Sequence, residues 1–460
     1  MSRAFEGRRL PETARSSSLG SETHNKMKLS NLGRYSLCSS VAAALLVACG
    51  RSQPPIGGPS AMPQSPAMAQ RFQHPTLSLA RGTSTDGTFP TRRLVPINGK
   101  LYGTTLYGGA YCPSRSRGGC GTVFSITTRG TETVLHSFGN GSDGVYPSSM
   151  TFVGDGLYGT TEFGGAHGNG VVFSITTSGE EHVLHSFGKP PDGNDPAGLT
   201  NIHGKGLYGT TLYGGAYGMG TVFSVTTNGV EKVVHSFGEG CKNGYCESGS
   251  KPYGRLLEVG SRLYGTTLNG GAANDGIVFS MSTAGQTKVL YSFSNYGPSG
   301  ESVGANGGLV DLGGVLYGTT SWGSGYYDDG TVFSVTTNGT GKVLHNFDAG
   351  CGKRVDGAHP AASLIDVNGT FYGTTSAGGK YGSSYYCDGS GTVYSVTPSG
   401  RVKVLYSFGS TSGDGTSPLG ELTRLNGILY GTTYYGGACG DGTVFSITLS
   451  GTEKVLHSFC

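Results

Sequence analysis

Residues 429–437 read Leu-Tyr-Gly-Thr-Thr-Tyr-Tyr-Gly-Gly, followed by Gly-Thr-Val-Phe-Ser-Ile-Thr at 442–448 and Val-Leu-His-Ser-Phe at 455–459. This succession of motifs occurs seven times. A single unit of this kind cannot bury its apolar face and must stack on its neighbours, and a period of 50–58 residues suits a propeller blade. The Tyr-Gly-Thr-Thr core begins at Tyr102, Tyr158, Tyr208, Tyr264, Tyr317, Tyr372 and Tyr430.

Each repeat is predicted to contain four β-strands. Apolar residues alternate with a period of two in segments rich in Val, Ile, Thr, Tyr and Phe, which is typical of strands. Dipeptides such as Asn426-Gly427 and Ser450-Gly451 are predicted to close tight antiparallel hairpins between strands one and two and between strands three and four. The strands expected in the last copy are Leu422–Leu425, Ile428–Tyr434, Thr443–Leu449 and Lys454–Phe459.

The other two connections are longer, and in a meander they lie on the face opposite the tight turns. One is the Gly-Gly loop after strand two, and the other follows strand four and often reads Asp-Gly-x-x-Pro. This segment occurs at Asp86–Pro90, Asp143–Pro147, Asp192–Pro196, Asp356–Pro360 and Asp414–Pro418. Either connection could be the one that crosses between blades.

Seven such sheets predict an all-β fold, a seven-bladed β-propeller with four antiparallel strands per blade, over residues 75–460. An open β-solenoid or a two-domain arrangement is the alternative. Thr76–Leu79 resembles a degenerate strand four and could help to close the ring. Charged residues are only 13% and the formal net charge is +3, which leaves no basic stripe for nucleic-acid phosphates.

The N-terminal region is interpreted as an export signal followed by a tether. Residues 1–26 are predicted to be a disordered extension upstream of the true start at Met27. Residues 27–48, ending in Leu46-Val47-Ala48 before Cys49, resemble a bacterial lipoprotein signal, which implies that Cys49 is lipidated and becomes the N-terminus. Residues 49–74 are Pro-rich and predict a tether. We expect a lipid-anchored envelope protein facing outside the cytoplasm; an ordinary secretory signal is the alternative.

Eight further cysteines lie outside the predicted strands. An even number in an exported chain favours disulfides, and the spacings lack the C-x-x-C pairs typical of zinc sites. All eight belong to the long-loop face. The predicted pairs are Cys112–Cys120, Cys241–Cys246, Cys351–Cys387 and Cys439–Cys460.

One position before the Gly pair is usually aromatic. In a closed ring these side chains would form a circlet, which could bind a flat ligand such as a sugar or could pack between blades. The candidates for ligand binding are Tyr107, Phe163, Tyr213, Trp322 and Tyr435, and the series is interrupted by Asn269 and Ala377.

Histidines and aspartates recur at fixed positions of the repeat, and they are weak candidates for catalytic or metal-binding residues. A His recurs at one strand-four position, which indicates a structural role, because catalysis needs one asymmetric constellation. Aspartates before strand three and in the Asp-Gly-x-x-Pro segments could offer oxygens to calcium, although turn formation is the alternative; no other cofactor is expected. The residues concerned are His136, His185, His235, His345 and His457, with Asp275, Asp329 and Asp441.

The consensus LYGTT-x-x-GG-x-x-x-x-GTVFS resembles the GloVer-type tandem repeat of bacterial exported proteins, from Leu94 onward. That family has no established activity, so the resemblance implies fold and export only. We expect a monomeric, noncatalytic surface propeller that binds or scaffolds a glycan or protein. The alternative is an exported glycan hydrolase or lyase, for which a unique acid pair would be diagnostic; the adjacent Asp328 and Asp329 point opposite ways in a strand and do not qualify.

Overall fold

The computed structural model describes residues 85–112, 119–242, 245–294, 304–323, 329–347, 356–383 and 388–460. They belong to one compact unit, Leu77–Cys460. The predicted signal, Cys49, the tether, Thr76–Leu79 and the pair Cys351–Cys387 lie outside the described residues.

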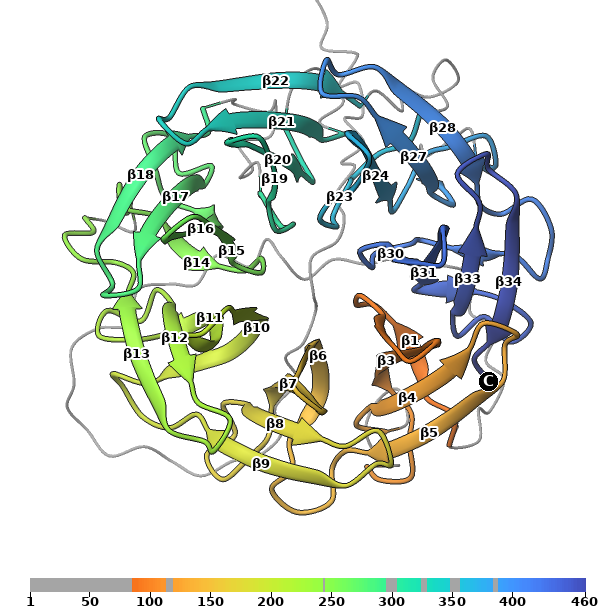
Figure 1. Ribbon diagram of the computed structural model, residues 1–460, viewed down its shortest axis with the longest axis horizontal. Coiled ribbons are helices and arrows are strands. Elements are labelled where there is room, and N and C mark those ends of the chain that lie inside the picture. Colours follow the sequence, from red (N-terminus) through yellow and green to blue (C-terminus); the bar gives the residue numbers. More distant parts are fainter. Residues whose placement is uncertain are drawn as a thin grey trace, which may run out of the picture. The chain divides into compact units, whose positions relative to one another are not determined.

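Seven antiparallel sheets surround a centre, so the chain is an all-β, seven-bladed propeller (Figure 1). Blades 1 to 3 contain β1 (Thr88–Pro90), β2 (Val95–Ile97), β3 (Lys100–Tyr107), β4 (Thr122–Thr127) and β5 (Glu132–Ser137); β6 (Val145–Val153), β7 (Gly156–Phe163), β8 (Val171–Ile175) and β9 (Glu181–Ser186); and β10 (Gly193–Ile202), β11 (Gly206–Gly214), β12 (Thr221–Val225) and β13 (Glu231–Ser236).

Blades 4 and 5 contain β14 (Ser250–Pro252), β15 (Leu257–Val259), β16 (Arg262–Asn269), β17 (Ile277–Ser282) and β18 (Thr287–Ser292); and β19 (Val310–Leu312), β20 (Val315–Thr320), β21 (Thr331–Thr336) and β22 (Gly341–Asn346). Blades 6 and 7 contain β23 (Ile365–Val367), β24 (Thr370–Thr375), β27 (Thr392–Val396) and β28 (Val402–Ser407); and β30 (Thr423–Leu425), β31 (Ile428–Thr433), β33 (Thr443–Ile447) and β34 (Glu453–Ser458). Two short ribbons pair β25 (Gly382–Ser383) with β26 (Asp388–Gly389) and β29 (Gly415–Thr416) with β32 (Tyr435–Gly436).

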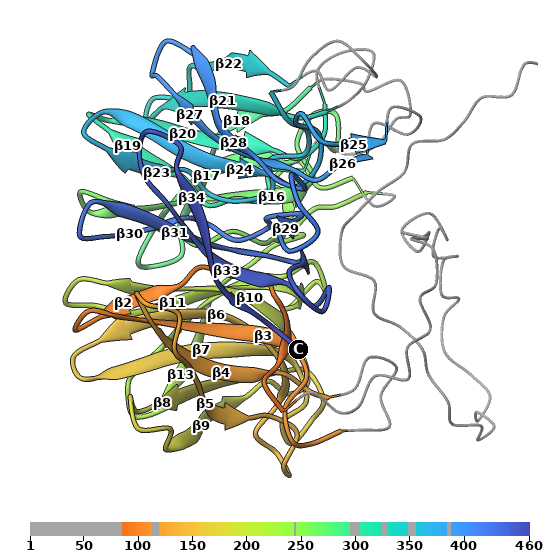
Figure 2. The ribbon, with the colours of Figure 1, turned by 90° about the vertical axis from the view of Figure 1, so that its right-hand side faces the viewer.

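Each blade is built from one copy of the repeat. Blade 7 pairs β30, β31, β33 and β34, all from the last copy, and the other sheets follow the same order. The segment after strand four therefore crosses between blades, and the Gly-Gly loop stays within a blade. Figure 2 shows the tight hairpins, such as β30–β31, on one face and the ribbons β25–β26 and β29 on the other.

The glycine of Tyr-Gly-Thr-Thr makes room for a buried aromatic ring. A Cβ added at Gly209 would lie 2.3 Å from Cζ of Phe223, and one at Gly103 would lie 2.5 Å from Cζ of Phe124. Both phenylalanines are fully buried. The glycine on strand two therefore leaves the space that the aromatic side chain on strand three fills.

The two threonines of the motif have different partners. In most blades the first donates its hydroxyl to a carbonyl of the next blade's inner segment, as in Thr104 Oγ1 to Ser148 O (3.1 Å) and Thr319 Oγ1 to Ala362 O (3.0 Å). The second joins strands two and three, because Thr105 Oγ1 accepts the Thr122 N–H at 3.1 Å. One threonine therefore links blades and the other links strands within a blade.

The core lies between the blades. The Phe of Val-Leu-His-Ser-Phe, or its equivalent, packs edge to face on the strand-three aromatic ring of the following blade, with centroids 5.1 Å apart for Phe138 and Phe173. Such pairs contribute about 0.5–1.5 kcal/mol each beyond their buried area. The other pairs are Phe187–Phe223, Phe237–Phe279, Phe293–Phe333, Phe347–Tyr394, Phe408–Phe445 and Phe459–Phe124.

Three of the predicted disulfides are present, Cys112–Cys120, Cys241–Cys246 and Cys439–Cys460. The predicted hairpin turns are also confirmed, since Asn426 and Gly427 both have positive φ, 50° and 80°. The disulfides indicate an extracellular or envelope protein, because such bonds persist in oxidising compartments.

Candidate functional site

The residue before proline in the inter-blade segments has a strained backbone. Phe89, Tyr146 and Asp195 have φ of 59°, 60° and 60°, a left-handed conformation that is uncommon for residues other than glycine. The N–H of each donates to the preceding blade, as in Tyr146 to Cys120 O at 2.8 Å. The same conformation occurs at Lys251, His359 and Ser417.

Several of these six pre-proline residues contact the residue before the Gly pair in the same blade or in a neighbouring one. We call the two sets together the inner girdle. Tyr107 packs on Phe89 at 5.8 Å and on Tyr146 at 5.1 Å, and Tyr435 packs on Phe89 at 5.5 Å between ring centroids. The girdle lies on the side of the ring that carries the long loops. Its side chains differ from one blade to the next.

The five predicted ligand-binding residues have different environments in the girdle. Tyr107 is buried, with 6% of its surface exposed, whereas Tyr213 is 44% exposed. Phe163, Trp322 and Tyr435 are half-buried. Trp322 lies against His359, with ring centroids 4.1 Å apart. The circlet therefore packs between blades along much of its length, and Tyr213 is its most accessible member.

One part of the girdle is apolar and another part is charged. We call the charged part, formed by Asp195, Lys251 and Tyr213, the charged arc. In blades 3 and 4 its pre-proline residues are Asp195 and Lys251, and the ammonium of Lys251 lies 5.4 Å from the centre of the Tyr213 ring. Burial lowers the pKa of Lys251. Burial, assisted by the charge of Asp195, raises the pKa of Tyr213.

Arg92 connects this charged arc to other blades. Its Nη2 donates to Glu162 Oε1 of blade 2 at 3.1 Å, and its guanidinium carbon lies 5.4 Å from the ring centre of Tyr253 in blade 4. Burial raises the pKa of Glu162, and Arg92 opposes that shift. Burial and the nearby Glu162 raise the pKa of Asp195 to about 7. Glu162 and Asp195 thus form an asymmetric pair of acids in a desolvated site.

Sequence reasoning missed this pair, although a signal was present. Glu162 is the one charged residue among the seven that follow Thr-Thr, and Asp195 is the one acid among the six strained pre-proline residues. The residues equivalent to Glu162 are Leu106, Leu212, Leu268, Ser321, Ser376 and Tyr434.

A second group of charges spans the centre of the ring. Arg255 Nη2 of blade 4 donates to both carboxylate oxygens of Glu421 in blade 7, at 2.8 and 2.9 Å. Arg93 Nε of blade 1 lies 3.6 Å from Glu421 Oε1. Beside Arg255 is a cavity of about 260 Å³, also lined by Asn201, His203 and Glu258.

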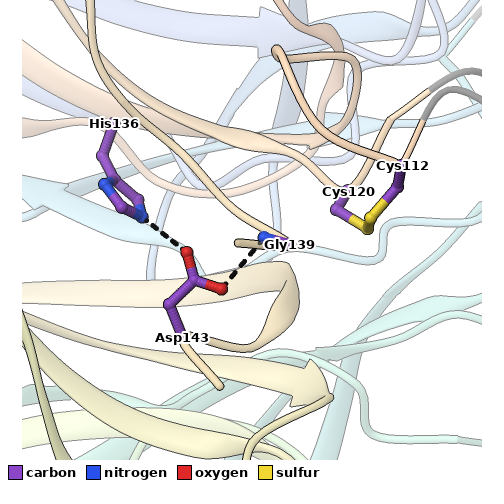
Figure 3. Close-up of a disulfide and its surroundings, with 5 residues drawn as sticks. All are labelled: Cys112, Cys120, His136, Gly139 and Asp143. Carbon is purple, nitrogen blue, oxygen red and sulfur yellow. Dashed lines mark hydrogen bonds and ion pairs between the residues drawn. A yellow bond between two sulfur atoms is a disulfide. The ribbon is translucent and has the colours of Figure 1, made fainter. Parts of the chain in front are cut away.

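The recurrent histidines tie the outer strand to the inter-blade segment. His136 Nε2 lies 3.0 Å from Asp143 Oδ2, and Asp143 Oδ1 accepts the Gly139 N–H at 3.0 Å, close to the Cys112–Cys120 disulfide (Figure 3). These contacts fix the Asp143 carboxylate between the outer strand of blade 1 and the backbone of the segment that leads to blade 2. The equivalent pairs are His185–Asp192, His345–Asp356, His457–Asp86 and Tyr406–Asp414.

Within the part of the chain that the structure describes, no helix is long and apolar enough to cross a bilayer. No curated protein matches this sequence. Similar solved structures include a puromycin hydrolase variant (11% identity, TM-score 0.50, 81% of this chain and 54% of that one) and a computationally designed protein, Ika8 (14%, 0.46, 82% and 92%). The chain spans about half the length of the hydrolase, and an identity of 11% to it reflects the fold alone.

The repeat itself identifies the family. A model of the Gloeobacter/Verrucomicrobia repeat matches residues 112–321 and 300–460, which together cover most of the chain. The chain therefore belongs to the Gloeobacter/Verrucomicrobia repeat family.

Proposed function

We propose that this protein is a noncatalytic binding propeller of the bacterial cell envelope, and that it binds its ligand at the charged arc of the inner girdle. The observation that carries the proposal is that the strained position before proline holds the charged residues Asp195 and Lys251 beside the exposed Tyr213. The rigid propeller holds the backbone of Asp195 and Lys251 in a costly left-handed conformation on one face of the ring. Backbone strain of this kind concentrates at ligand sites.

The composition of the arc suits a glycan. Tyr213 offers an exposed aromatic face, and Asp195 and Lys251 beside it supply hydrogen-bonding groups for hydroxyls. Exposed Tyr217 and Tyr245, 48% and 62% accessible, belong to the long loops of the same region. An aromatic platform with polar neighbours is the usual composition of a recognition site.

A glycan and peptidoglycan array on the purified chain, followed by calorimetry, tests this proposal. Tyr213→Ala is expected to weaken binding by about 1–3 kcal/mol, as for the loss of an aromatic anchor. Tyr111→Ala is the matched control, since Tyr111 is 40% exposed but lies in blade 1. Equal effects of the two substitutions, or binding that neither one changes, would refute the placement of the site.

One observation favours an exported glycan hydrolase or lyase as a second candidate. Glu162 and Asp195 both have raised pKa values, and a carboxyl that titrates near neutral pH can serve as a general acid. Turnover that both Asp195→Asn and Glu162→Gln abolish, with binding retained, would establish this alternative.

We also propose that a lipid attached to Cys49 anchors the protein to the membrane. Palmitate labelling and membrane fractionation of a Cys49→Ala variant test it: both the label and membrane retention should be lost. Retained labelling would instead leave a secreted protein as the better account.

A further inference from the structure

At two joints between blades, ligand atoms of an imidazole and two carboxylates lie within 4.8 Å of one another. At the joint between blades 7 and 1 they are Asp86, Glu132 and His457, which we call the closure cluster. At the joint between blades 2 and 3 they are His185, Asp192 and Glu231, the second cluster. In each cluster one nitrogen or oxygen atom per residue lies within 4.8 Å of the others.

The two clusters use the same positions of the repeat. The histidine lies on the outermost strand of one blade, β34 or β9. Asp192 belongs to the segment that follows β9, and Asp86 belongs to the equivalent segment that precedes β1. The glutamate is the first residue of the outermost strand of the next blade, Glu132 in β5 or Glu231 in β13. Each cluster therefore joins three chain segments from two blades.

The spacing of the ligand atoms fits a small divalent cation. His457 Nε2 lies 3.1 Å from Asp86 Oδ2, and His185 Nε2 lies 3.2 Å from Asp192 Oδ2. Metal–nitrogen and metal–oxygen bonds of about 2.0–2.2 Å place neighbouring ligand atoms about 3 Å apart. One oxygen of each glutamate lies within 4.8 Å of both of these atoms.

The glutamates provide a second observation, which Glu181 and Glu453 share at the equivalent position of other joints. Glu132 Oε1 and Glu231 Oε1 are buried atoms with no hydrogen-bond partner. Each faces a second carboxylate across the joint. A buried acceptor of this kind is costly unless a proton or a cation satisfies it.

Backbone groups already orient one of the aspartates. Asp192 Oδ2 accepts the Gly188 N–H at 2.7 Å, and Oδ1 accepts the Gly193 N–H at 2.7 Å. Ligands that are fixed by hydrogen bonds of this type bind a metal with little reorganisation.

We propose that the closure cluster and the second cluster are divalent transition-metal sites, each holding one ion of the Zn²⁺ or Mn²⁺ type. An imidazole among the ligands favours these ions over calcium, which takes oxygen ligands. At the closure cluster the ion would join the last strand, β34, to blade 1. Among the described residues, no strand from the N-terminal part of the chain completes the four-stranded sheet of blade 7, because all four of its strands come from the last repeat.

The chain contains a matched site for comparison. At the joint between blades 6 and 7, Tyr406 replaces the histidine beside Asp414 and Glu453, and Tyr406 OH donates to Asp414 Oδ2 at 2.8 Å. Glu453 Oε1 is also a buried acceptor without a hydrogen-bond partner. This joint has the two acids without the imidazole, so it should bind a transition metal far more weakly.

Calorimetric titration of the untagged, metal-stripped full chain with Zn²⁺, repeated with Mn²⁺, tests the proposal. Glu132→Gln and Glu231→Gln should each bind one equivalent less than the unchanged protein, and the double variant two less. Glu453→Gln should bind as many as the unchanged protein. Zn²⁺ should raise the Tm of the unchanged protein, and the double variant should lose that shift.

Two results would overturn the proposal. One is a stoichiometry that Glu132→Gln and Glu231→Gln leave unchanged. The other is a Tm that neither Zn²⁺, Mn²⁺ nor a chelator alters while Glu132→Gln raises it at pH 8, because a shared proton would then be the occupant. Circular dichroism of each variant distinguishes a lost site from a lost fold.

Discussion

Phe459, which follows the last strand of blade 7, packs edge to face on Phe124 of blade 1, with ring centroids 5.2 Å apart. The two residues are at opposite ends of the propeller sequence, yet their contact repeats the one made at the six other joints. Both rings are fully buried. The ring is therefore closed by the same packing that joins consecutive blades, supplemented by the Phe89 N–H donating to Asp441 O at 2.8 Å.

Phe459→Ala is expected to destabilise the propeller by about 3–5 kcal/mol, the usual cost of truncating a buried phenylalanine. Phe237→Ala, at the joint between blades 3 and 4, is the matched variant and should cost a similar amount. Chemical denaturation measures both. A loss below about 1 kcal/mol for Phe459→Ala alone would mean that the closing joint contributes little to stability.

Gly209→Ala is expected to destabilise by roughly 1–3 kcal/mol, because overpacking forces the buried ring to move. The added Cβ would lie 2.3 Å from Phe223 Cζ. Gly413→Ala is the control, since a Cβ there meets nothing within 4 Å. Thermal unfolding of both variants checks the expectation, which an unchanged Tm for Gly209→Ala would contradict.

Loss of the Cys439–Cys460 disulfide should cost more than loss of Cys241–Cys246. The bonds close loops with sequence separations of 21 and 5 residues. Loop-closure entropy predicts about 3 and 2 kcal/mol respectively. Paired Cys→Ser variants, compared by denaturant unfolding, test the order. The reverse order would show that native packing outweighs the entropy of the unfolded chain.

Asp195→Asn should remove a pH dependence of stability. The pKa of Asp195 is raised from 3.8 to about 7 by burial. Between these values the native state keeps a proton that the unfolded chain releases, so stability falls as pH rises from about 4 to about 7. At pH 8 the variant should be more stable than the unchanged protein by about 1–4 kcal/mol, at 1.36 kcal/mol per pKa unit.

Urea denaturation at pH 4 and pH 8 measures this effect. The two proteins should differ little at pH 4. Asp155→Asn is the control, because Asp155 is exposed in the turn between β6 and β7. A stability difference for Asp195→Asn that is the same at both pH values would rule out the raised pKa.

Local chemistry in the sequence determined the strands, the hairpins and three disulfide pairings. Alternation with a period of two needs only neighbouring residues, and Asn426-Gly427 favours its turn in any context. The strand edges shifted only slightly: the predicted Ile428–Tyr434 is observed as Ile428–Thr433. Cys112 and Cys120 are eight positions apart and belong to one loop, so their pairing was also local.

Tertiary structure alone decided the blade phase, the charged arc and the metal-ligand clusters. Arg255 and Glu421 are 166 positions apart, and Asp86 and His457 are 371 apart. Such pairs meet because the ring closes, and closure depends on how seven blades pack, which no local pattern encodes. The repeat shows which residues occupy equivalent positions; the ring decides which side chains of different blades meet at its centre and its joints.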